Sequence, residues 1–216
     1  ASLLVTERIP IKKTEGVAPI LKAKAAIAMD AATGIVLFEK NAETPLPMAS
    51  LTKIMTAILI LEAHDLQEVV KVTQNYSSLA GVKIGLQKNE RITVGDLLIG
   101  LLVRSGGDAA LALAEYHKSS VNAFVEEMNR KTATLHLKNT VFKNPVGLDE
   151  EGHVSSAYDL AILAKYAMRN RSFRSIVRLT EAEVTSVDGG IRHAFKNTNK
   201  LLESYLNVLG VKTGTT

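Results

Sequence analysis

A serine and a lysine one helical turn apart are the residues best suited to chemistry in this sequence. Ser50 and Lys53 belong to Ser-Leu-Thr-Lys, and Lys53 is the single charge within residues 51–61, where apolar residues recur at helical spacing. Residues three apart share a helix face, so the hydroxyl and the amine are neighbours. Apolar surroundings lower the pKa of a lysine, and a helix N-terminus favours developing negative charge. The pattern predicts a nucleophile beside a base.

The same two residues also have a purely structural interpretation. Ser50 can cap the N-terminus of the helix while Lys53 extends its ammonium group to solvent. Ser-x-x-Lys is frequent by chance, so spacing alone leaves both interpretations open.

Two further short segments carry residues that could bind or process a ligand. Ser105-Gly106-Gly107 lies between two expected helices, and Lys212-Thr213-Gly214 lies on an extended segment near the end of the sequence. Alone, the first is typical of a helix-capping turn and the second of an ordinary strand. Gly214 would let a ligand backbone approach, and Lys212 could meet a carboxylate.

Taken in order, the three segments resemble the signature of penicillin-binding proteins and serine β-lactamases. Five more stretches strengthen the likeness, namely residues 29–34, 47–57, 144–149, 155–160 and 197–202. Over about residues 24–216 the sequence resembles the low-molecular-mass D-alanyl-D-alanine carboxypeptidases. The resemblance covers most of the chain, and the stretches jointly make it specific.

The resemblance implies a role for each matching residue. Ser50 is acylated, Lys53 accepts its proton, and Ser105 relays protons. Lys212 and Thr213 hold the terminal carboxylate of the substrate, and the backbone N–H groups of Ser50 and Thr215 form the oxyanion hole. The substrate-binding residues implied are thus Lys212, Thr213, Gly214, Thr215 and Gly107, and neither a cofactor nor a metal is implied.

The sequence departs from the family pattern in two places. Gly107 stands where the family usually has an asparagine whose amide helps to hold substrate. The sequence ends two residues after Gly214, where the family continues with another strand and a C-terminal helix. The resemblance therefore implies a catalytic domain truncated after the strand that carries Lys212.

Other catalytic patterns find little support. Glu203-Ser-Tyr-Leu-Asn207 spells the motif that positions a deacylating water in class A β-lactamases, but it begins nine positions before Lys212, much later in the chain than in those enzymes. We interpret Glu203 as a surface residue. No paired metal-ligand spacing occurs among the histidines, which we expect to be structural or solvent-facing: His64, His117, His136, His153 and His193.

Composition narrows the class of protein. A chain of 216 residues with 46% hydrophobic and 22% charged residues is ordinary for one globular domain. The absence of cysteine excludes disulfides, thiolate nucleophiles and Cys-ligated metals. A net charge of +4, scattered along the chain, suits acidic substrates or an anionic envelope better than nucleic acid. No apolar run reaches the length of a membrane span, and membrane attachment is left open.

Periodicity and turn residues predict the elements. Residues 1–23 are expected to form an extended arm, and residues 24–216 the catalytic domain. Hairpins are expected at 25–39 and 180–195, and a strand at 208–216. The expected helices cover residues 51–63, 94–103, 108–117, 120–135 and 156–168. The predicted class is α+β, and the resemblance implies a β-lactamase/transpeptidase-like fold, with an antiparallel sheet flanked by helices and an inserted, mostly helical subdomain over about 64–170.

The function implied by the resemblance is a serine-type D-Ala-D-Ala carboxypeptidase. It would act on peptidoglycan stem peptides ending in D-Ala-D-Ala through a Ser50 acyl-enzyme, be inhibited covalently by β-lactam antibiotics, and work outside the cytoplasmic membrane, where that substrate lies. A D,D-endopeptidase and a class A-like β-lactamase are alternatives. A non-catalytic penicillin sensor or peptidoglycan-binding module is an alternative of another class, to which Gly107 gives room.

Overall fold

The computed structural model describes residues 9–11 and 16–215, and it alternates short strands with helices along the chain. The strands are β1 (Ala26–Met29), β2 (Val36–Lys40), β3 (Leu46–Pro47), β4 (Val69–Lys71), β5 (Arg91–Thr93), β6 (Val154–Ser155), β7 (Glu181–Thr185) and β8 (Arg192–Lys196). The α-helices are α1 (Lys53–Ala63), α2 (Val94–Ile99), α3 (Gly107–Lys118), α4 (Val121–Thr134), α5 (Ala157–Ala167) and α6 (Arg171–Val177). Short helices of other types are η1 (Ala49–Thr52) and η3 (Lys200–Glu203), which are 3₁₀-helices, and η2 (Gly100–Arg104), a π-helix.

The strands pair in antiparallel fashion, two at a time. Within the described residues β1 pairs with β2, β3 with β6, β4 with β5, and β7 with β8. Both expected hairpins are confirmed, and in the second of them Val184 lies opposite His193. The predicted α+β class with antiparallel pairing is confirmed. Strands from distant parts of the chain also meet, since β3 and β6 are more than a hundred residues apart.

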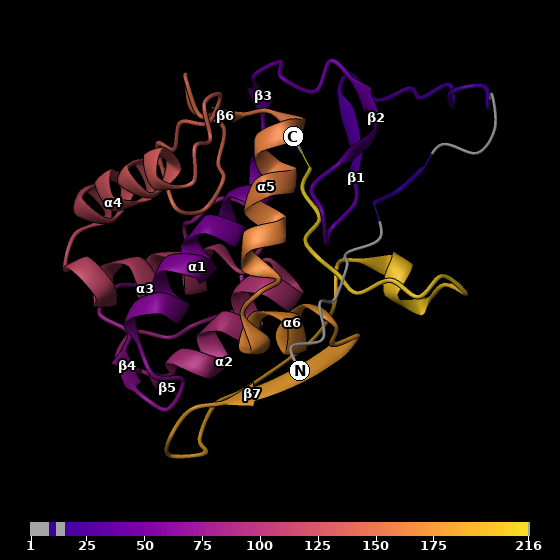
Figure 1. Cartoon of the computed structure of the whole chain (residues 1–216). Helices are drawn as coiled ribbons and strands as arrows, with labels where there is room; N and C mark the ends of the chain where they lie inside the picture. Colours follow the sequence, from indigo (N-terminus) through magenta and orange to yellow (C-terminus); the bar gives the residue numbers. More distant parts are fainter. Residues whose placement is uncertain (1–8, 12–15, 216) are drawn as a thin grey trace, which may run out of the picture.

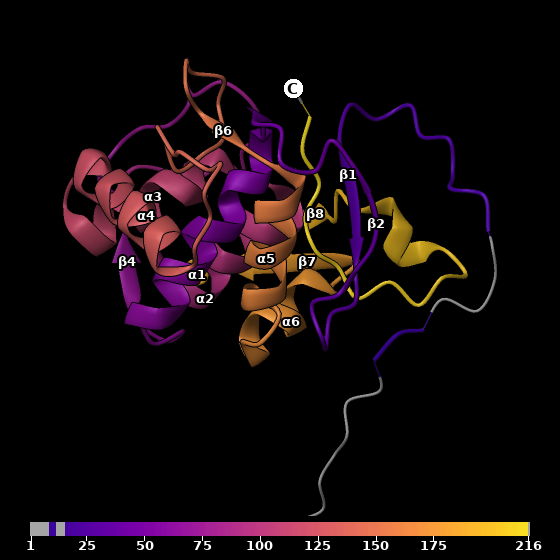
Figure 2. The ribbon, with the colours of Figure 1, turned by 45° about the horizontal axis from the view of Figure 1, so that its top comes forward.

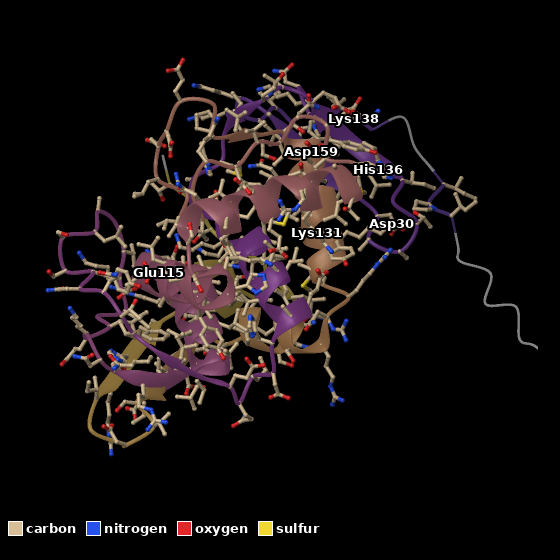
Figure 3. The ribbon with its side chains drawn as sticks, turned by 90° about the vertical axis from the view of Figure 1, so that its left-hand side faces the viewer. Asp30, Glu115, Lys131, His136, Lys138 and Asp159 are labelled. Carbon is tan, nitrogen blue, oxygen red and sulfur yellow. The ribbon has the colours of Figure 1, made fainter. Side chains whose placement is uncertain are left out.

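Helix α1 lies at the centre of the helices, between α3 and α4 on one side and α5 on the other (Figures 1 and 2). Its residues from Lys53 to Ile60 are all buried, which agrees with a segment that has almost no polar side chains. Lys131 on α4, labelled in Figure 3, links α4 to α1 and α5. Its Nζ lies 2.7 Å from Glu62 Oε2 on α1 and 3.2 Å from the Tyr166 hydroxyl on α5. The helix that carries Lys53 is therefore held on both sides.

Side-chain caps explain where several helices begin. Ser156 accepts a hydrogen bond from Asp159 N at the start of α5, and Thr93 accepts one from Asp96 N at the start of α2. The expected helix over 94–103 divides into α2 and the π-helix η2, whose C-cap is Ser105. All five expected helices are present, and their ends differ from the expectation by a few residues at most.

The expected strand at 208–216 is wrong for the residues described. Residues 208–215 form no strand, and Val208 N donates to Leu206 O within its own segment. Apolar alternation favours an extended chain, but a strand also needs a neighbour to accept and donate its backbone hydrogen bonds. In Figures 1 and 2 this yellow segment runs past α5 on the side of the β1–β2 hairpin.

The expected arm over residues 1–23 is only partly described. Residues 1–8 and 12–15 lie outside the described part of the chain, and residues 9–11 and 16–23 form neither helix nor strand. The boundaries of the helical subdomain stay a prediction. Among the helices described, none combines the length and the apolar character needed to cross a bilayer.

Candidate active site

Ser50 and Lys53 meet as the helical spacing predicts. Ser50 lies on η1, and Lys53 begins α1 directly after it. Lys53 Nζ donates to Ser50 Oγ at 3.0 Å and also to the carbonyl of Val146. Lys53 is only 1% exposed, so its ammonium does not reach solvent, and burial lowers its pKa to about 7. The nearby Lys212 ammonium lowers this pKa further, while Asp108 opposes the shift. The amine is thus available as a base near neutral pH.

The loop over residues 144–148 brings the Val146 carbonyl to Lys53. Asn144 Oδ1 accepts from the backbone N–H groups of Val146, Gly147 and Leu148, at 3.2, 2.7 and 3.1 Å. Thr56 Oγ1 on α1 donates to the Pro145 carbonyl at 2.8 Å. Gly147 has φ +84°, and a Cβ there would lie 2.1 Å from the Ala49 carbonyl oxygen. Only glycine allows this loop to contact the turn that carries Ser50.

A buried histidine, His153, supports the turn that carries Ser50. Lys143 N donates to His153 Nδ1 at 2.9 Å, so the proton of a neutral ring lies on Nε2. His153 Nε2 donates to Thr52 Oγ1 at 2.7 Å, and Thr52 Oγ1 donates to the Ala49 carbonyl at 2.8 Å. Burial lowers the pKa of His153, which favours this neutral form. The expectation that this histidine is structural is confirmed.

Ser105 occupies a strained backbone position at the end of η2. Its φ of 71° and ψ of 33° place it in the left-handed region, which non-glycine residues seldom adopt. Strained residues and π-helical turns both occur often at functional sites. The strained turn brings Ser105 to the cavity that also contains Ser50 and Lys53.

That cavity, of about 500 Å³, gathers residues from distant parts of the chain. Its lining consists of Ser50, Lys53, Ala80, Gly81, Val82, Ser105, Val146, Gly147, Leu148, Thr198, Thr213, Gly214 and Thr215. Six of the eight candidate residues therefore lie around one space. Gly214 packs closely on the Ser50 turn, since a Cβ at Gly214 would lie 3.2 Å from the Met48 carbonyl oxygen.

The other two candidates, Lys212 and Gly107, are not among the residues that line the cavity. Lys212 Nζ donates to the Thr213 carbonyl at 2.8 Å, and burial lowers the pKa of Lys212 to about 8. Gly107 is buried, and its N–H donates to the Val82 carbonyl at 2.8 Å. A Cβ at Gly107 would lie 3.0 Å from Val146 Cγ1 and 3.1 Å from Leu79 Cδ2. Gly107 thus contacts two wall residues, Val82 and Val146, while its direct contact with substrate stays a prediction.

The sequence did not reveal Thr198 as part of the site. Thr198 lies just after β8, and its Oγ1 is 2.7 Å from Thr213 Oγ1. It belongs to the stretch 197–202 that resembles the family, but a lone threonine has no spacing that predicts a role. Residues 80–82 were missed for the same reason. By contrast, Glu203 is exposed and does not line the cavity, as its interpretation as a surface residue predicts.

Comparison with known proteins adds to this geometry. The sequence model of the D-alanyl-D-alanine carboxypeptidase family matches residues 12–216. The chain belongs to this family. The carboxypeptidase family was predicted from the three motifs and the five stretches, and that prediction is confirmed.

Two members of the D-alanyl-D-alanine carboxypeptidase family and one solved structure illustrate the similarity. DacF of Bacillus subtilis is 42% identical over 202 residues, which are 90% of this chain and 51% of that protein. A D-alanyl-D-alanine carboxypeptidase of Streptomyces sp. strain K15 is 36% identical over 216 residues, 91% of this chain and 73% of that protein. The crystal structure of the Streptomyces K15 DD-transpeptidase superposes with a TM-score of 0.87 at 34% identity, over 93% of this chain and 83% of that one. The chain spans about half the length of DacF, and the penicillin-binding-protein fold is confirmed.

Proposed function

We propose that the protein is a serine-type D-Ala-D-Ala carboxypeptidase. The observation that carries the proposal is the 3.0 Å contact between Ser50 Oγ and the buried amine of Lys53, whose pKa burial lowers to about 7. A hydroxyl beside an uncharged amine has the arrangement of an activated nucleophile. Membership of the carboxypeptidase family supports the same reaction.

In the proposed reaction, Ser50 Oγ attacks the carbonyl carbon between the two D-Ala residues. The Ser50 proton passes to Lys53 Nζ, and the oxyanion is stabilised by the N–H groups of Ser50 and Thr215. As the C–N bond breaks, the leaving amine takes the proton through Ser105, and free D-Ala departs. Water then attacks the ester, the C–O bond to Ser50 breaks, and Ser50 regains its proton. Each step uses residues that line one cavity.

The proposed substrate is a peptidoglycan stem peptide that ends in D-Ala-D-Ala. The carboxylate of the peptide would be bound by the Thr213 hydroxyl and by the charge of Lys212, whose Nζ donates to the Thr213 carbonyl. Penicillins, which carry a reactive amide and a carboxylate, would acylate Ser50 and act as covalent inhibitors. Because peptidoglycan lies outside the cytoplasmic membrane, we place the enzyme there.

Release of free D-Ala tests the proposal. The full chain is incubated with a model pentapeptide and, in parallel, with cross-linked muropeptide. We expect D-Ala from the pentapeptide, no release by Ser50→Ala, and unchanged release by Ser175→Ala, which alters an exposed serine on α6. Mass spectrometry after penicillin treatment should show one adduct, absent in Ser50→Ala.

The alternatives predict other results in the same assays. A D,D-endopeptidase would cleave only the cross-linked substrate. A β-lactamase would hydrolyse penicillin at a typical enzyme turnover of about 10 per second. A sensor would form the adduct and release nothing from either peptide. The exposed position of Glu203, outside the cavity lining, supports slow penicillin hydrolysis, because that carboxylate is not placed to orient water.

A further inference from the structure

One wall of the cavity is a segment without helix or strand. We call residues 80–90 the wall loop; its first three residues, Ala80, Gly81 and Val82, line the cavity. Backbone hydrogen bonds hold the two ends of this segment, from Gly107 N to the Val82 carbonyl and between Val72 and residues 89 and 90, so its middle depends on side chains from other elements. Two buried side chains hold it there, one from α3 and one from β8.

The first of these side chains is Asp108, which follows the Ser105-Gly106-Gly107 segment. Its carboxylate accepts from the N–H groups of Ile84, Gly85 and Leu86 at 3.0, 2.8 and 3.1 Å. Asp108 is 1% exposed and lies in the first turn of α3. This side chain holds the middle of the wall loop against the helix that follows Ser105.

The second side chain is His193 on β8, which contacts the wall loop twice. His193 Nε2 lies 2.7 Å from Glu90 Oε1, and Nδ1 lies 3.1 Å from the Ile84 carbonyl oxygen. Through these two contacts the ring joins the middle of the wall loop to its last residue, Glu90. The other oxygen of Glu90 accepts from Gln87 N at 2.9 Å. The side chains of His193 and Glu90 are 5% and 0% exposed.

β8 leads directly to another part of the cavity lining. The strand ends at Lys196, and Thr198, two residues later, lines the cavity and contacts Thr213. Thr198 N also donates to the Val103 carbonyl on η2 at 3.1 Å, just ahead of Ser105. His193 therefore joins the wall loop to the strand that leads to Thr198.

We propose that His193 is a positioning residue that, with Glu90, sets the separation of the wall loop from Thr198 and so the fit of the substrate in the cavity. This inference rests on the proposed carboxypeptidase function. Ser50 and Lys53 lie on η1 and α1, which His193 does not contact through any hydrogen bond among the described residues. Loss of the contact should therefore impair binding of substrate more than the chemical step.

The test compares His193→Gln with the wild-type full chain on a D-Ala-D-Ala pentapeptide. We expect KM to rise about tenfold while kcat changes less than about threefold, because loss of binding that is equal in the ground state and the transition state raises KM and leaves kcat unchanged. Hydrogen exchange of the amides in residues 80–90 should become faster. Glu90→Gln, which keeps the size of the side chain, should give the same two changes. The double variant should be no worse than His193→Gln alone, because His193→Gln already loses the contact between the two side chains.

His117→Gln is the matched control. His117 Nε2 lies 3.1 Å from Glu127 Oε2, the His117 side chain is 7% exposed, and neither residue lines the cavity. This variant should keep the wild-type KM and the wild-type exchange of residues 80–90. An unchanged KM in both His193→Gln and Glu90→Gln, or a rise of equal size in His117→Gln, would overturn the proposal.

The exchange measurement separates this inference from the proposed function. If the wild-type protein released no D-Ala, the function would be wrong, yet faster exchange confined to residues 80–90 in His193→Gln would still support the contact as the anchor of the wall loop. If residues 80–90 exchanged hydrogen at the wild-type rate in both His193→Gln and Glu90→Gln, the contact would not anchor the wall loop, whatever the enzyme activity.

Discussion

Thr198 and Thr213 meet through their hydroxyl groups, with the two Oγ1 atoms 2.7 Å apart at the wall of the cavity. The pair joins the segment after β8 to the segment that contains Lys212. One hydroxyl donates to the other, so the orientation of the Thr213 hydroxyl depends on Thr198.

Thr198→Val should therefore weaken substrate binding. The substitution keeps the shape and removes one neutral hydrogen bond, whose loss usually costs about 0.5–1.5 kcal/mol, so kcat/KM should fall by roughly 2- to 13-fold. Steady-state release of D-Ala measures the change. Thr134→Val, at an exposed position near the end of α4, is the control and should leave kcat/KM unchanged. A Thr198→Val enzyme with the wild-type kcat/KM would contradict a role for this hydroxyl.

A plot of kcat/KM against pH should be a narrow bell-shaped curve. Lys53, with its pKa lowered to about 7, must lose a proton to act as a base, so kcat/KM should rise as pH increases through that value. Lys212, with its pKa lowered to about 8, must keep its proton to attract the carboxylate, so kcat/KM should fall as pH increases further. The measurement is D-Ala release between pH 5 and pH 10.

A change of substrate tests whether Lys212 causes the fall of kcat/KM at high pH. A peptide amidated at its C-terminus has no carboxylate, so the fall at high pH should shrink while the rise at lower pH stays. If kcat/KM with the free peptide were flat from pH 6 to pH 9, neither lysine would have its proposed role.

Protonation of His153 should destabilise the protein in acid. Burial lowers the pKa of this histidine below its ordinary value of 6.5, so the unfolded chain binds the proton more readily than the folded one. Its contribution to stability is therefore present above about pH 6.5 and is lost as pH falls, because an N–H at Nδ1 would face the N–H of Lys143. The melting temperature Tm, measured between pH 5 and pH 8, should fall less steeply with acid in His153→Gln. His136→Gln, at an exposed position, should keep the wild-type slope.

An asparagine at Gly107 should disturb the cavity wall. Its Cβ would lie 3.0 Å from Val146 Cγ1, and the Val146 carbonyl accepts from Lys53. Overpacking typically costs about 1–3 kcal/mol, which lowers Tm by about 2–4 °C for each kcal/mol in a chain of this size. Gly107→Asn and Gly107→Ala should both lower Tm and slow acylation by penicillin, unlike Gly16→Asn, where nothing lies within 4 Å of the added Cβ and the backbone is not in the positive-φ region. Faster acylation in Gly107→Asn than in wild type would show instead that the missing amide limits the reaction.

The sequence predicts best the features that depend on residues close to one another in the chain. The contact of Ser50 with Lys53 follows from one turn of helix, and the helices follow from apolar periodicity and capping residues such as Ser156. The interpretation of Lys53 as buried also follows locally, because its helix has no polar face to bring it to solvent.

Long-range contacts decide the rest of the site. Ala80 and Val82 reach the cavity because Asp108 and His193 bind the wall loop from elements that follow it in the chain, and no local pattern records this. Thr198 lies at the cavity because β8 ends two residues before it and directs the chain there. The expected strand at 208–216 fails for a related reason, since strand pairing depends on a neighbour and not on the segment alone.

The burial of Lys53 links catalysis to the final stage of folding. Its side chain is among the largest that are fully buried. The amine becomes a base only once the surrounding side chains have packed around it and excluded water, because this burial lowers its pKa. A partly folded chain would keep Ser50 and Lys53 one turn apart but leave the lysine hydrated and charged. Covalent labelling by a fluorescent penicillin would therefore report completion of the core, so the same reaction that titrates the active site would also time the last step of refolding.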